Sequence, residues 1–139
     1  IMEFYVNELQ KTIKAVHRPI VIITSNNEKE LPDAFLRRCV FHYINFPDKD
    51  LMRDIINVHF PKIKEKILES CIRQFYLLRI VKQLRKKPST SELIDWIGVL
   101  LKAGLTEEDI EQKIPFLGTL IKKEVDLNYL KKYKKDVFE

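Results

Sequence analysis

Hydrophobic positions follow two different patterns along this chain of 139 residues, and the change comes near Pro47. Before Pro47, apolar residues gather in short runs that are rich in β-branched and aromatic side chains, a composition typical of strands. After it, apolar residues recur every three or four positions, as on an amphipathic helix. We therefore predict an α/β portion over residues 1–47 and an all-α portion over residues 48–139, mostly helical overall.

The pattern of residues 1–47 predicts four strands and one helix. Residues 3–6 and 12–16 are typical of two short strands around a polar turn. Residues 20–23 form a continuous β-branched run, which favours a strand buried on both faces, as in a parallel sheet. Residues 31–38 predict a short helix with Pro32 and Asp33 in its first turn, and residues 40–46 alternate as a further strand.

The second portion predicts a series of helices with recognisable ends. Asp48 caps a helix that Pro61 stops, and residues 62–78 repeat apolar residues at helical spacing. Residues 89–92, Ser-Thr-Ser-Glu, form a capping-box pattern that begins a helix over residues 91–102, which Gly104 ends. Thr106 begins another helix that reaches Pro115, and residues 127–135 predict a last, basic one. Trp96 lies at helical spacing with Leu93, Ile97 and Leu100, which indicates a core position.

Positive charge is concentrated in one segment. The formal net charge is +5, and Arg79, Lys82, Arg85, Lys86 and Lys87 follow one another with no acidic residue between them. Such a cluster indicates an anionic partner at that place, with a solvated linker as the alternative.

The cysteines and the lengths of the apolar runs indicate the cellular compartment of the protein. Cys39 and Cys71 lie far apart without metal-ligand spacing, so we interpret both as reduced core residues of a cytoplasmic protein. The longest apolar run is too short to span a membrane, and no secretory leader is expected. His17, His42 and His59 share no helical spacing and are not expected to be catalytic or to bind a metal.

Two motifs in the first portion resemble an AAA+ ATPase of the MoxR or dynein-related type. They are the strand-like ending Ile-Ile-Thr-Ser-Asn at residues 22–26 and the sequence Leu-Pro-Asp-Ala-Phe-Leu-Arg-Arg-Cys at residues 31–39. Residues 86–96, KKPSTSELIDW, are similar to the lid of those proteins, and residues 3–16 resemble their hairpin before sensor 1. The resemblance implies the last strands of a P-loop AAA+ core followed by an α-helical lid bundle.

Two elements of such an ATPase are missing from the sequence. No Gly is followed by Lys, so the chain holds no phosphate-binding loop, and no apolar strand ends in Asp-Glu. The resemblance therefore implies a C-terminal portion. The intact protein would bind Mg-ATP in a ring with other AAA+ subunits, and a hexamer is the expected ring. It would couple hydrolysis to remodelling of a client protein, whereas this chain alone would be inactive and hold no bound nucleotide or Mg²⁺.

The resemblance assigns roles to single residues. Asn26 is the sensor 1 candidate, which orients the attacking water, and Thr24 is a secondary candidate in the same network. Arg38 is the arginine-finger candidate, with Arg37 as the runner-up or helper. The alternatives are an Asn that turns the chain and two arginines that offset the helix dipole.

The lid departs from the family pattern at one position. Glu92 stands where an Arg would act as sensor 2, so Arg85, Lys86 or Lys87 are candidates to replace that Arg at the nucleotide. A clamp-loader-like relative is a third possibility, because Arg-Cys also ends its finger helix. The alternative from a different class is a non-catalytic basic helical module that binds nucleic acid or protein, which the charge at residues 79–87 favours.

Overall fold

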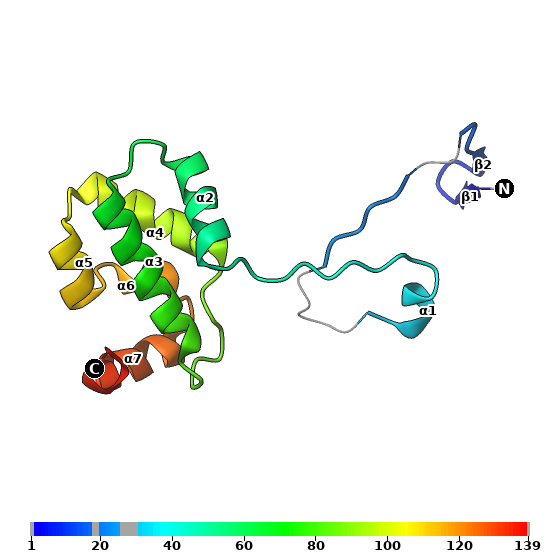
Figure 1. The fold of residues 1–139 in the computed structure, drawn as a ribbon. Helices are drawn as coiled ribbons and strands as arrows, with labels where there is room; N and C mark the ends of the chain where they lie inside the picture. Colours follow the sequence, from blue (N-terminus) through cyan, green and yellow to red (C-terminus); the bar gives the residue numbers. More distant parts are fainter. Residues whose placement is uncertain (1, 18–19, 26–30, 139) are drawn as a thin grey trace. The chain divides into compact units, whose positions relative to one another are not determined.

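The computed structural model describes residues 2–17, 20–25 and 31–138, with side chains as far as Tyr133. Within these ranges the chain is mostly helical, with one two-stranded antiparallel sheet followed by helices (Figure 1). It divides into two compact units, Ile1–Ile44 and Asn45–Glu139. The change in sequence pattern thus falls within three residues of the boundary between units.

The first unit opens with the predicted hairpin. Strands β1 (Glu3–Val6) and β2 (Lys11–Lys14) are antiparallel, and Glu3 lies opposite Lys14. Lys14 Nζ lies 3.3 Å from the Glu3 carboxylate, an exposed cross-strand pair of opposite charge. Both strands are found close to the predicted bounds, with β2 beginning one residue earlier and ending two residues earlier.

The other two predicted strands are wrong for this structure. Residues 20–23 and 40–46 have no regular secondary structure. Ile20, which was expected to be buried, is 93% exposed, and Val40 is 102% exposed. A strand is held by hydrogen bonds to a neighbouring strand, and the only strand pairing among the described residues is that of β1 with β2. The local sequence is therefore strand-like, but the structure gives it no partner.

The predicted finger helix is short. Helix α1 covers Asp33–Leu36, one turn instead of the predicted two. Cys39, which we expected in a core, is exposed, because the strand that should have buried it is not formed.

The second unit contains the five predicted helices and a short sixth one, α6, that the sequence did not predict. They are α2 (Lys49–His59), α3 (Glu65–Ile80), α4 (Thr90–Ala103), α5 (Glu107–Lys113), α6 (Leu117–Leu120) and α7 (Glu124–Phe138). Helix α3 begins and ends later than predicted, and α7 is longer at both ends. Asp48 caps α2 by accepting a hydrogen bond of 2.9 Å from Leu51 N, and Thr106 caps α5. Gly104 ends α4 with φ 66°, a left-handed conformation that favours glycine.

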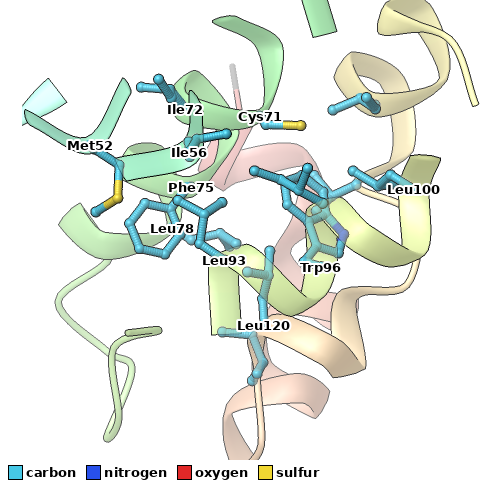
Figure 2. Close-up of a cluster of buried hydrophobic side chains, with 14 of the residues drawn as sticks. Met52, Ile56, Cys71, Ile72, Phe75, Leu78, Leu93, Trp96, Leu100 and Leu120 are labelled. Atoms are coloured by element: carbon cyan, nitrogen blue, oxygen red, sulfur yellow. The ribbon is translucent and has the colours of Figure 1, made fainter. Parts of the chain in front are cut away.

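The core of this unit lies between α2, α3 and α4 and is completed by α5, α6 and α7 (Figure 2). Trp96 is fully buried with Leu93, Ile97 and Leu100, as the helical spacing predicted. Its indole Nε1 donates a hydrogen bond of 2.5 Å to the carbonyl of Pro115, in the turn between α5 and α6. Trp96 therefore attaches α4 to the turn between α5 and α6 by a hydrogen bond as well as by apolar packing.

The two cysteines are expected to differ sharply in reactivity. Cys71 is fully buried, and burial raises the pKa of its thiol to about 12, whereas Cys39 is exposed. Because the thiolate is the nucleophile, a disulfide reagent at pH 8 should modify one thiol in the native chain and both in denaturant. Peptide mapping should locate the fast thiol at Cys39, and equally fast labelling of Cys71 would contradict its burial.

Candidate functional site

The arginine-finger candidates lie at the C-terminal end of α1. Arg37 and Arg38 are both exposed, and the guanidinium Nη1 of Arg38 donates a hydrogen bond of 3.0 Å to the carbonyl of Ala34, one turn earlier. Basic side chains at this position satisfy the last carbonyls of a helix. Releasing one such exposed hydrogen bond costs about 1 kcal/mol, so Arg38 is available to an anion that approaches it.

The sensor 1 candidates are described only in part. Thr24 is exposed and lies in the segment without regular secondary structure. Asn26 lies outside the described residues, so its predicted position at a strand end stays a prediction.

The two lysine candidates lie in the loop between α3 and α4, where the backbone is held by a buried carboxylate. Asp126, in the first turn of α7 and 1% exposed, accepts hydrogen bonds of 3.0 Å from both Arg85 N and Lys86 N. Each carboxylate oxygen takes one amide, so the loop is fixed on the start of α7. The side chains of Lys86 and Lys87 are exposed on this fixed backbone.

Glu92 performs the capping that the sequence predicted. Its side chain is largely buried and accepts a hydrogen bond of 2.6 Å from Ser89 N, which closes the capping box of α4. Lys86 Nζ lies 3.7 Å from the same carboxylate. The position that the resemblance would give to a sensor 2 Arg therefore holds an acid paired with a neighbouring lysine.

Arg79, the first cation of the basic segment, is held between Phe46 and the carbonyl of Pro88. Its guanidinium lies 3.3 Å from the ring centroid of Phe46, and it donates a hydrogen bond to the carbonyl of Pro88. Partial burial lowers the pKa of Arg79 and raises that of Tyr76, whose hydroxyl donates to the carbonyl of Pro47 at 2.5 Å. Arg79 is thus a packing residue of the bundle, in contrast to the exposed lysines.

The structure brings some of the predicted site residues together. Arg37 and Arg38 adjoin at the end of α1 in the first unit, which also contains Thr24, whereas Lys86 and Lys87 adjoin in the second unit. Sequence reasoning missed Asp126, the residue that organises the loop. Its signal is weak, since a single Asp in a basic segment is also common on a solvated helix face.

The described residues contain neither a cluster of metal ligands nor a membrane-spanning helix. No group of three or more His, Cys, Asp or Glu within residues 2–17, 20–25 and 31–138 is arranged to hold a metal ion. None of the helices seen in the described part of the chain has the length and apolar character needed to cross a bilayer. Comparison with protein-family models, curated proteins and solved structures gave no match for this chain.

Proposed function

We propose that this chain is the sensor 1, arginine-finger and lid portion of an AAA+ ATPase of the MoxR type. The intact ATPase would hydrolyse Mg-ATP in a ring of subunits and use the energy to remodel a client protein. The chain by itself would be inactive, because its sequence holds no phosphate-binding loop.

The observation that carries the proposal is the pair of exposed strand-like segments. Ile20, Val21, Ile22 and Ile23 are 58–93% exposed, and Val40, Phe41, Tyr43 and Ile44 are 62–102% exposed. Folded soluble domains rarely leave so much contiguous apolar surface in water. The exposure of both segments is explained if strands from elsewhere in an ATPase core pair with them. Residues 20–139 would then contain, in order, a strand, the finger helix, a second strand and the lid.

The helical unit supports the lid assignment by its position in the chain. Among the described residues, the buried apolar side chains of its core all lie between Met52 and Leu130, within the second unit. A lid that moves as one body needs such a separate core.

The site residues would act on a nucleotide that another part of the ring holds. The Arg38 guanidinium would donate to the phosphate oxygens of a neighbouring subunit's nucleotide and offset the charge that develops there. The Asn26 amide would orient the attacking water, with Thr24 beside it. Lys86 and Lys87 are proposed to reach the same phosphates from the lid in place of the missing sensor 2 Arg.

The first test is to read the coding DNA in frame upstream of the codon for Ile1. The proposal expects Gly-x-x-x-x-Gly-Lys-Ser/Thr and, after it, an apolar strand that ends in Asp-Glu. The proposal would be overturned by an in-frame stop codon directly upstream, if no other polypeptide that binds this chain carries the two motifs either.

A further inference from the structure

A lysine-rich surface lies where the loop between α3 and α4 meets the start of α7. We define this basic surface by its six exposed cations, Lys82, Arg85, Lys86, Lys87, Lys122 and Lys123. The two segments that carry them are joined at Asp126, whose carboxylate binds the backbone amides of Arg85 and Lys86. In Figure 1 the loop after α3 likewise lies beside the start of α7.

The acidic groups on these segments leave the surface positive. Asp126 is buried and its two oxygens are occupied by backbone amides. Glu92 accepts a hydrogen bond from Ser89 N and pairs with Lys86, one of the six cations. The six cations lie in residues 82–87 and 122–123. Glu124, which follows Lys123, is the one exposed acidic residue next to either segment in the sequence. The cations therefore outnumber the acids that can screen them.

The composition of the surface favours a nucleic-acid backbone over a protein as its ligand. Five of the six cations are lysines, which act as point charges and need no fixed geometry of the anion. The other Arg of the segment, Arg79, is stacked on Phe46. Residues 79–88 and 121–127 contain no aromatic residue, and aromatic side chains are the usual anchors of a protein interface.

We propose that the basic surface binds the phosphate backbone of a nucleic acid without reading its sequence, and that Asp126 preorganises the surface. Lysines on a fixed loop lose less conformational entropy on binding than lysines on a free one. Lys86 and Lys87 are also the candidates for the nucleotide phosphates, but DNA binding requires no ATP hydrolysis. A failure to bind DNA would leave the proposed roles of Asn26 and Arg38 intact, and a failure to hydrolyse ATP would leave DNA binding intact.

The test measures binding of the full chain to a labelled mixed-sequence DNA duplex by fluorescence anisotropy. If four to six phosphates are neutralised, raising NaCl from about 50 to about 200 mM should lower the affinity by roughly 10² to 10³. An unlabelled polyglutamate peptide of similar length serves as the competitor. Absence of binding at the lower salt would overturn the proposal, and so would polyglutamate competing as well as DNA, which would indicate an acidic protein partner.

Two triple variants locate the binding. The first carries Lys82→Gln, Lys87→Gln and Lys122→Gln. The matched control carries Lys62→Gln, Lys64→Gln and Lys102→Gln, which removes the same charge from exposed positions elsewhere in the same unit. We expect the first to weaken binding at least about tenfold and the control less than about threefold. Equal losses in both would show a general charge effect and contradict a local surface.

Asp126→Asn separates preorganisation from charge. The amide keeps one acceptor oxygen where the carboxylate has two, so one of the two loop amides loses its partner, while the net charge becomes more positive. The proposal expects weaker DNA binding, whereas general attraction expects tighter binding. Thermal unfolding of the variant confirms that it is folded, and tighter binding by a folded variant would contradict the role of Asp126.

Discussion

Changing Arg38 to alanine is expected to lower kcat for ATP hydrolysis by roughly 10³ to 10⁵ in the proposed ATPase, assembled with a phosphate-binding loop. The reason is that an arginine finger offsets charge that appears only as the bond to the leaving phosphate breaks. ATP binding should change little, because that charge is absent from the bound ground state. Steady-state hydrolysis and equilibrium binding of a fluorescent ATP analogue measure the two effects separately.

Arg37→Ala is the matched control for this experiment. It removes the same charge from the adjacent position of the same helix end, where Arg37 is also exposed. A loss within about tenfold is expected if Arg37 is a helper. A larger loss from Arg37→Ala than from Arg38→Ala would move the finger to Arg37. Unchanged hydrolysis in both variants would show that the pair merely caps α1.

Changing Trp96 to alanine is expected to destabilise the helical unit by about 3–5 kcal/mol. The indole is the largest fully buried side chain of the core, and its Nε1 binds the carbonyl of Pro115. The substitution removes both the apolar contacts and that hydrogen bond, so the turn between α5 and α6 loses its attachment to α4. Urea unfolding of the full chain, followed by far-UV circular dichroism, measures the change.

Two further variants divide this loss into its parts. Trp96→Phe keeps a ring in the core but leaves the Pro115 carbonyl without its donor, which is expected to cost about 1–3 kcal/mol. Ile80→Ala, at a side chain that is 69% exposed, is expected to change stability by less than about 0.5 kcal/mol. A Trp96→Ala variant that unfolds like Ile80→Ala would contradict the core assignment.

The helices were predictable because their signals are local. Asp48, the capping box at Ser89 and Glu92, and Gly104 each act within one turn of the helix that they begin or end. The apolar spacing then indicates which face is buried, and Cys71, Phe75 and Trp96 all lie in the core as expected.

The strands at residues 20–23 and 40–46 failed for the opposite reason. β-branched composition predicts that a segment can form a strand, but the pairing partner is not encoded in the segment itself. Only the hairpin, whose partner lies a few residues away, was predictable with its pairing. The error at Cys39 follows from the same cause, because its expected burial depended on the sheet.

The candidate site was predictable only in its charged residues. The run of basic residues from Arg79 to Lys87 is visible in the sequence, but the sequence does not distinguish one cation of the run from another. The structure separates Arg79, stacked on Phe46, from the exposed lysines. It also adds Asp126 from 40 residues further along the chain, a tertiary contact that no local pattern indicates.

The attachment of Phe46 and Pro47 to α3 has a mechanical consequence. Phe46 stacks on Phe75 and Arg79, and the Pro47 carbonyl accepts from Tyr76, so the polypeptide that enters the bundle is clamped from its second residue. Phe46 and Pro47 therefore move with α3, although they precede α2 and have no regular secondary structure of their own.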